Sequence, residues 1–533
     1  MMLQKEEIEI KNIDHLGIVA GIVDDLGLVE KINKIVGVDS REKISTGQVV
    51  KAIILNGLGF VSRPLYLFSQ FFEDKAIEHL LGKEIKAEDL NDDKLGRTMD
   101  KLYRVGLSEL FLLIALDTIK KYQITTKYSH LDSTSLHLHG EYQADNPKKE
   151  KGIIKENPIY ITQGYSRDHR PDLKQCVMDL IVSSDGDVPL FFRAGDGNES
   201  DKAVFGKILL EFKKQIDFES IMVCDSALYS QNNLKLIANL KWISRVPFSL
   251  KLAKSLVQSV TSSQLEKSSQ EGYSYCEQKV SYGGIEQRWL IVESAERKKS
   301  DLDKLNRQIE QEAKSAATEV AKLLKVEFSQ TGEAKLKYQE FNQQFKYYQI
   351  EKFKILKACN KLGKTIYKIQ AELTQNFDYI VSYKQQAGRF ILATNCLDDK
   401  QLSTSEILSV YKQQQSCERG FRFIKDPLFF ADSLFVKNPE RVETMMMLMG
   451  LCLLVYSIGQ RQLRLSLLSS KTKVKNQLGK LTNNPTLRWI FQCFQGIHVL
   501  VLQGVKQIIN LTKERQLFLQ FLPAHCQKYY FSS

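Results

Sequence analysis

Apolar side chains in the first 120 residues recur at helical spacing. In HLGIVAGIVDDLG, which begins at His15, they recur every three or four positions, which predicts a helix. Ser45 and Gln48 have the spacing of a capping box in front of a second apolar run. Further helices are predicted around 65–81 and 107–120. We therefore expect residues 1–120 to form a helical N-terminal domain.

The period changes from helical to alternating after residue 121. KYSHLDSTSLHLHG predicts a strand, and two more strand-like runs flank the Asp185-Gly186 turn. A helix over 202–216, a short buried strand over 221–224, a helix near 232–240 and a strand from Trp242 follow. This succession is typical of a mixed α/β sheet, whose first part we place at 121–250.

Residues 251–375 interrupt that pattern. They begin with a predicted β-hairpin near 273–294 and continue into a charged helix with an apolar stripe over 302–323. The stripe has two interpretations, packing within the chain or a dimer zipper. Because GRFILATN at 388–395 resumes a buried strand, we interpret 251–375 as an inserted subdomain. The core then continues through 376–460, and 461–533 is expected to be a helical C-terminal region.

Charge and cysteine content narrow the class of protein. The 533 residues include 75 Lys and Arg against 63 Asp and Glu, a net charge of +12, which favours phosphate-rich partners. The nine cysteines show no CxxC pattern, as expected of reduced core residues. Four of the first ten residues are charged, unlike those of a signal peptide, and the longest apolar run, 445–459, is shorter than the ~20 residues of a membrane helix. We expect a soluble, cytoplasmic protein that does not bind membranes.

Three acidic residues stand in positions where a carboxylate needs a partner. Asp132 lies inside a predicted strand, Asp225 follows the apolar strand IMVC, and Glu418 lies in YKQQQSCERGFRFIK, a predicted helix rich in basic and aromatic residues. Converging carboxylates repel one another unless cations bind between them, and hard oxygen ligands suit Mg²⁺ or Mn²⁺. Each acid alone is more typical of a surface or turn position, whereas the three together favour a metal-dependent site.

The same segments resemble a known family. YKQQQSCERGFRFIK is similar to the Tyr-x2-Arg-x3-Glu-x6-Lys signature of DDE transposases in the insertion-sequence-four superfamily, and the N-terminal region resembles that of its IS-sixteen-thirty-four subgroup. LDST with Asp132 and VCDSALYS with Asp225 look like the first two catalytic aspartates. The spacings of 93 and 193 residues leave room for an insertion before Glu418.

The resemblance implies an RNase H-like catalytic core, a mixed five-stranded sheet with helices, with Asp132 on its first strand and Asp225 just after its fourth. It implies two Mg²⁺ ions, replaceable by Mn²⁺, held by Asp132, Asp225 and Glu418. The expected partner is double-stranded DNA, both the terminal inverted repeats and the target, bound by a homodimer. The N-terminal domain is then a candidate for end binding or dimerisation.

The signature also predicts residues that bind DNA. On one continuous helix Tyr411, Glu418 and Lys425 would line a single stripe facing the DNA. The signature Arg is replaced by Gln414, which offers only neutral hydrogen bonds, while Arg419 and Arg422 lie near enough to substitute. Tyr411, Gln414, Arg419, Arg422 and Lys425 are therefore the candidate DNA-binding residues of this segment.

Two further features have competing interpretations. Trp289, in the predicted hairpin, is either a packing residue or, as in related enzymes, an aromatic that stacks on a flipped base. His130, His137 and His139 lie on or beside the Asp132 strand, where a zinc or manganese site competes with ordinary strand histidines.

Three functions remain open at this stage. The first is a transposase that cuts DNA ends and joins them to a target. The second is an RNase H-like nuclease without strand transfer, and the third a decayed copy that only binds DNA.

Overall fold

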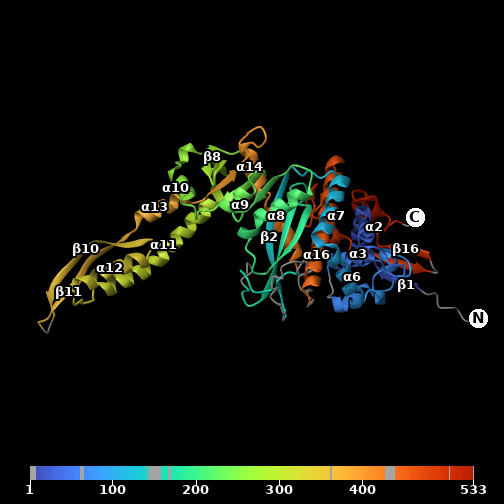
Figure 1. Ribbon diagram of the computed structural model, residues 1–533, viewed down its shortest axis with the longest axis horizontal. Helices are drawn as coiled ribbons and strands as arrows, with labels where there is room; N and C mark the ends of the chain where they lie inside the picture. The colour runs from blue at the N-terminus through green and yellow to red at the C-terminus, as the bar shows by residue number, and fades with distance from the viewer. Residues whose placement is uncertain are drawn as a thin grey trace, which may run out of the picture. The chain divides into compact units, whose positions relative to one another are not determined.

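The computed structural model describes residues 8–60, 65–140, 142, 158–165, 170–360, 363–426, 438–502 and 505–531. Its contacts divide the chain into two compact units, shown as a ribbon in Figure 1. The first unit comprises residues 1–242 and 410–533, and the second residues 243–409.

A mixed sheet forms the centre of the first unit. Strands β2 (Tyr128–Leu138), β3 (Lys174–Ser183), β4 (Pro189–Gly195) and β5 (Ile221–Cys224) lie in the order β4-β3-β2-β5. The first three pair antiparallel and β5 pairs parallel to β2. The predicted turn between β3 and β4 contains Gly186 at φ 85°, a backbone conformation that glycine adopts without strain. The strands predicted from alternation are thus confirmed.

Helices α8 (Asp201–Gln215) and α9 (Gln231–Leu236) connect the later strands and contact each other. They confirm the helices predicted at 202–216 and 232–240, although α9 ends earlier than expected. Strand β6 (Trp242–Val246) begins at Trp242, as predicted. The chain therefore follows the strand and helix succession expected of an α/β core.

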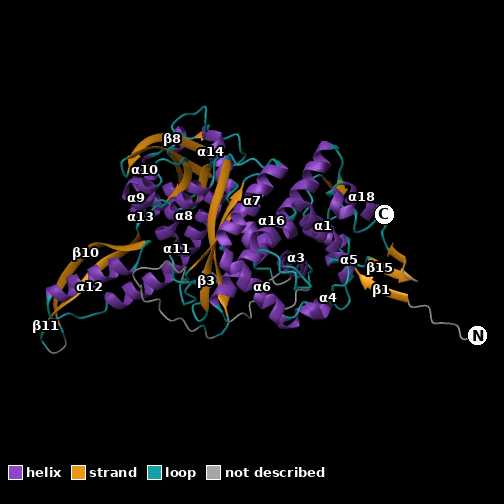
Figure 2. Cartoon of the chain, turned by 45° about the vertical axis from the view of Figure 1, so that its right-hand side comes forward, coloured by secondary structure: helices purple, strands orange, loops and turns teal. Residues whose placement is uncertain are grey.

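The N-terminal helices pack around one long helix, α16 (Pro439–Ser469). Those that contact it are α1 (Leu16–Leu26), α3 (Thr46–Gly57), α6 (Asp92–Val105) and α7 (Leu107–Tyr122). Ser45 caps α3 through the predicted capping box with Gln48. Around 65–81 the expected single helix is a 3₁₀ turn followed by α4 (Phe68–Phe72) and α5 (Ile77–Leu81). The N-terminal helices, α16 and side chains of β3 and β4 share one hydrophobic core. Figure 2 shows these helices and strands as a cartoon.

Helix α16 is long and apolar enough to cross a membrane by length and composition alone. However, 89% of its most apolar window is buried inside the protein. It contacts β4 as well as the N-terminal helices. Its apolar character is therefore accounted for by its place in the core.

The C-terminal region departs from the helical expectation. Besides α17 (Leu487–Cys493), α18 (Lys513–Gln520) and α19 (Ala524–Gln527), it contains two short strands, β13 (Val474–Lys475) and β14 (Leu481–Thr482), and two longer ones. The longer ones, β15 (His498–Leu502) and β16 (Val505–Ile509), form a sheet with β1 (Ile8–Asn12). The helical assignment of 461–533 was wrong in this respect, because the partner of β15 lies at the opposite end of the sequence.

The second unit contains its own antiparallel strands, in the order β6-β12-β9-β8-β7. The predicted hairpin is β8 (Tyr273–Tyr282) with β9 (Ile285–Ser294), and the predicted strand at 388–395 is β12 (Arg389–Thr394). The remaining elements are β7 (Glu266–Lys267), α10 (Lys251–Ser259) and α13 (Phe377–Gln386).

A helix pair and a hairpin complete the second unit (Figure 1). Helices α11 (Ala295–Leu323) and α12 (Thr331–Gln344) contact the hairpin of β10 (Tyr348–Cys359) and β11 (Thr365–Gln375). From the predicted stripe of α11, Leu305, Ala316 and Val320 are buried, in small clusters that include Tyr347 and Phe341. The contacts of the stripe thus support packing within the chain.

Candidate active site

Two of the three predicted acids are placed side by side by strand pairing. In the parallel ladder of β2 and β5, Leu131 lies opposite Cys224. Asp132 and Asp225 are the next residues on their chains, and neighbouring strands lie about 4.8 Å apart. One oxygen of Asp132 accepts a hydrogen bond from the backbone N–H of Ser133 (2.9 Å), and one of Asp225 accepts from that of Ala227 (2.8 Å). Strand β5 is fully buried, so the sheet itself fixes this pair.

Two buried thiols show that the third acid lies in the same neighbourhood. Burial raises the pKa of Cys224, and the nearby charges of Asp225 and Asp132 raise it further. Burial likewise raises the pKa of Cys417, with Asp132 and Glu418 among the charges that add to the effect. The charge of Asp132 therefore acts on both thiols, one of which precedes Asp225 and the other Glu418. Asp132 thus lies near the segments that carry the other two acids.

Glu418 is carried by α15 (Gln415–Ile424), which packs on β2, β3 and α16. Cys417, Phe421 and Ile424 form the buried stripe of this helix. Glu418 lies on the exposed side, with 56% of its side chain accessible, and pairs with Arg422 at 3.6 Å. The apolar stripe thus docks the helix on the sheet and leaves the carboxylate at the surface.

The expected continuous helix from Tyr411 to Lys425 is not present. Tyr411 belongs to α14 (Thr404–Lys412), the chain turns at Gln413 and Gln414, and Lys425 is the C-cap of α15. The N–H groups of Gln413 and Gln414 bond to carbonyls three residues back, at Val410 and Tyr411, which tightens the turn and breaks the 3.6-residue period. The single stripe of Tyr411, Glu418 and Lys425 was therefore wrong.

The basic residues of α15 remain at the surface. Arg419 pairs with Asp187 at 2.9 Å and its side chain is 57% exposed. The side chain of Arg422 is 77% exposed. Lys425 and Tyr411 are partly exposed. All four are thus accessible from solvent, as residues that bind a phosphate must be.

Gln414 does not face solvent, which contradicts its assignment to DNA binding. Its side chain is 8% exposed. The amide Nε2 donates to the Leu131 carbonyl at 2.9 Å, and Oε1 lies 3.1 Å from Nδ1 of His130. Gln414 is therefore attached to β2 beside Asp132, and no sequence signal for this orientation was recognised.

Of the two interpretations of Trp289, the structure contradicts contact with DNA. It is fully buried in β9, between Ala393 of β12 and Gln278 of β8. Its indole N–H donates to the Gln287 side chain at 2.9 Å. No face of the ring is available to a base, so the packing interpretation is the correct one.

The histidines do not gather into a metal site. His130 is buried against Gln414, and His139 is exposed. In the described ranges, no three His, Cys, Asp or Glu side chains are grouped closely enough to hold a metal ion. The paired aspartates offer hard oxygen ligands of the kind that Mg²⁺ prefers, whereas Glu418 must turn toward them to join.

A buried polar network next to Asp132 was missed. The Ser133 hydroxyl bonds to Asp179 of β3, which also pairs with Arg193 of β4 at 2.7 Å, and Arg193 pairs with Glu199 at 2.9 Å. Burial raises the pKa of Asp179 to about 6 despite Arg193. The charged residues inside the apolar runs CVMDLIV and LFFRAG were the available signal.

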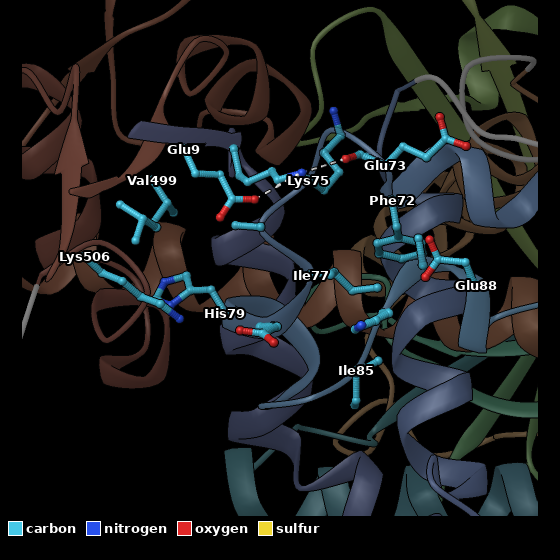
Figure 3. Close-up of a pocket in the computed structure, with 16 residues that line it drawn as sticks. Glu9, Phe72, Glu73, Lys75, Ile77, His79, Ile85, Glu88, Val499 and Lys506 are labelled. Atoms are coloured by element: carbon cyan, nitrogen blue, oxygen red, sulfur yellow. Dashed lines mark hydrogen bonds and ion pairs between the residues drawn. The ribbon is translucent and has the colours of Figure 1, made fainter. Parts of the chain in front are cut away.

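A groove of about 420 Å³ lies elsewhere in the first unit (Figure 3). Val499 of β15 and Ile77 of α5 contribute to its apolar lining. Lys11 bonds to the Glu73 carbonyl at 3.0 Å and pairs with Glu9 at 3.4 Å along its rim. The rim mixes both charges and contains none of the three acids, so this groove is separate from the candidate active site.

Comparison with known proteins agrees with this geometry. Residues 8–116 match a domain of unknown function, DUF4277. No curated protein matches. A cryo-EM structure of a piggyBac transposase synaptic complex with hairpin DNA is similar at 10% identity and a TM-score of 0.39, over 97% of this chain and 82% of that one; a similarity this low supports no argument.

The match that decides the family covers residues 129–455, which fit the model of the transposase DDE domain. This range is more than half of the chain and includes Asp132, Asp225 and Glu418. It spans the mixed sheet with one aspartate on β2 and another after β5, as expected of an RNase H-like core. The chain therefore belongs to the DDE-domain transposases.

Proposed function

We propose that this protein is the transposase of a bacterial insertion sequence, in the IS-sixteen-thirty-four subgroup of the insertion-sequence-four superfamily. It cuts DNA at the ends of its element and joins them to target DNA. The observation that carries the proposal is the register of β2 and β5, which sets Asp132 beside Asp225, together with α15, which brings Glu418 onto the same sheet. It works in the cytoplasm, where its DNA lies.

The proposed cofactor is a pair of Mg²⁺ ions, with Mn²⁺ as a substitute. Asp132 and Asp225 would hold them, and Glu418 would complete the ligand set. When bound, such ions activate the attacking oxygen and stabilise charge at phosphorus. The chain's own contribution is to fix two carboxylates on rigid strands and to carry the third on a surface helix that faces solvent.

Exposed basic side chains supply the proposed DNA contacts. Arg419 and Arg422 flank Glu418 on α15, and Lys425 ends the same helix. Such side chains neutralise phosphates, so DNA binding by this +12 chain should weaken steeply with salt. The end-binding role of residues 1–120 and a homodimer in the synaptic complex belong to the same proposal.

Strand transfer is the activity that tests the proposal. A labelled duplex carrying the element's own end is incubated with the protein, a plasmid target and Mg²⁺. Label joined to the plasmid by the wild type, and not by Asp132→Asn, supports a transposase. Nicking without joining indicates an RNase H-like nuclease, and DNA binding without nicking indicates a decayed copy; either result overturns the proposal.

A further inference from the structure

Gln414 occupies a buried position beside the strand that carries Asp132. It stands at the turn between α14 and α15, four residues before Glu418. Its amide reaches the strand that carries Asp132 and bonds to the two residues just before it, His130 and Leu131. The position that the family signature gives to a phosphate-binding Arg thus has a different task here.

The hydrogen bonds determine how the amide and the imidazole are oriented. The Leu131 carbonyl only accepts, so the NH₂ group of Gln414 must point toward it. The Oε1 of Gln414 then faces Nδ1 of His130, and Nδ1 must carry the proton and donate.

A third bond joins the same two segments. The Cys417 thiol lies 3.3 Å from the His130 carbonyl. Leu131 precedes Asp132, and Cys417 precedes Glu418, so bonded residues on both segments lie one position from an acid. We call these three hydrogen bonds the β2–α15 clamp.

We propose that His130 and Gln414 are positioning residues, which through the β2–α15 clamp set Glu418 at the distance from Asp132 that a shared metal site requires. This inference rests on the proposed function, since it concerns the same three acids. The clamp fixes where α15 begins along β2, while the exposed carboxylate of Glu418 keeps its rotational freedom.

The clamp is not needed simply to keep α15 on the sheet. Cys417, Phe421 and Ile424 are buried, and a Cβ on Gly420 would lie 3.0 Å from Leu453 of α16, so the helix is closely packed without Gln414. Arg could not replace Gln in the clamp: it has five donors and no acceptor, and Nδ1–H of His130 would be left unpaired. The clamp thus accounts for glutamine at this position.

The test measures metal affinity rather than activity. Mn²⁺ is titrated into the full-length protein, and free Mn²⁺ is followed by its EPR signal. Gln414→Met keeps the length of the side chain but removes all its hydrogen bonds, and we expect the Mn²⁺ affinity to fall about tenfold. The matched control is Gln415→Met, the same change at the exposed neighbouring position, which should bind Mn²⁺ like the wild type.

Two further measurements distinguish positioning of Glu418 by His130 and Gln414 from a general contribution of these residues to stability. Gln414→Met leaves two buried polar groups unpaired and should unfold at a lower temperature than Gln415→Met, so Mn²⁺ is titrated well below both unfolding midpoints. His130→Asn keeps an N–H near the position of Nδ1 and should bind Mn²⁺ nearly as the wild type does, whereas His130→Leu should lose about tenfold. Combining His130→Leu with Gln414→Met should add little further loss, because both break one clamp.

The outcomes distinguish this inference from the proposed function. Equal Mn²⁺ affinity in the wild type and Gln414→Met overturns the clamp alone. If Gln414→Met does not fold, the two His130 variants provide the test. Equal losses of Mn²⁺ affinity in His130→Asn and His130→Leu would then overturn the clamp. If Asp132→Asn binds Mn²⁺ as tightly as the wild type does, the proposed metal site itself fails.

Discussion

The two aspartates and the glutamate are held by different parts of the molecule. Asp132 lies within β2 and Asp225 directly follows β5, where backbone hydrogen bonds and a buried sheet fix their positions. Glu418 sits on a ten-residue helix that is docked by an apolar stripe and by side-chain hydrogen bonds. A residue on a paired strand cannot shift without breaking the ladder, whereas the exposed side chain of Glu418 can change rotamer while its helix stays packed.

This difference suggests a division of labour. The strands would provide a fixed pair of oxygen ligands, and the exposed side chain of Glu418, which is free to rotate, would provide an adjustable third. It agrees with the exposure of Glu418 and with the lack of a closed three-residue metal group among the described residues. Strand pairing thus places two of the three carboxylates, and rotation of the Glu418 side chain would bring the third to them.

The largest effect is expected from removing a strand-held charge. Asp132→Asn and Asp225→Asn should each lower the rate of end nicking by about 10³-fold or more, since several kcal/mol of charge stabilisation are lost. DNA binding and the unfolding midpoint should stay near wild type. The control is Asp217→Asn, at an exposed aspartate of the same unit, which should nick normally. A variant at Asp132 that keeps even a tenth of the activity would remove that residue from the site.

Changes of side-chain length should distinguish the strand-held acid Asp132 from the helix-held acid Glu418. Glu418→Gln should abolish most nicking in Mg²⁺ and in Mn²⁺ while DNA binding survives or tightens. Glu418→Asp keeps the charge one methylene shorter, and rotation of the exposed side chain should limit the loss to about tenfold. Asp132→Glu changes length by the same amount on a rigid strand and should lose nearly as much as Asp132→Asn. Similar losses in Glu418→Asp and Asp132→Glu would contradict the contrast.

Sequence patterns predicted the strand-held part of the site better than the helix-held part. The strand IMVC and the alternating segment around Asp132 are local signals, and both acids follow from them. The break at Gln413 and Gln414 was missed because helix propensity continues through it, while the competing contact joins Gln414 to His130, 284 residues away. The pairing of β1 with β15 was missed for the same reason, since no local pattern reports a partner at the other end of the chain.

In the second unit, Trp289 is held by strand pairing, as Asp132 is in the first. Trp289→Ala should destabilise this unit by about 3–5 kcal/mol, the usual cost of emptying a large aromatic site. Trp289→Phe should cost less and leave end nicking unchanged. Chemical unfolding and the nicking assay check both statements. A loss of nicking in a Trp289→Phe protein of normal stability would restore the base-stacking role.

The smallest effect concerns Asp179, which lies on β3 and cannot move toward water as Glu418 can. Burial raises its pKa to about 6, above the ~3.9 of an unfolded chain, so the folded state holds this proton more tightly. Its stabilising contribution is full below about pH 4, is lost as the pH rises to about 6, and amounts to at most about 3 kcal/mol. His15 and His130 act in the opposite direction, because burial lowers the pKa of each to about 4 and favours the folded state as the pH rises. Both histidines are present in the wild type and in Asp179→Asn, so their effect cancels in the difference between the two unfolding free energies. This difference should change between pH 4 and 6, because the wild type loses stability relative to the variant over that range. If the two unfolding free energies instead change with pH in parallel, Arg193 keeps Asp179 charged throughout.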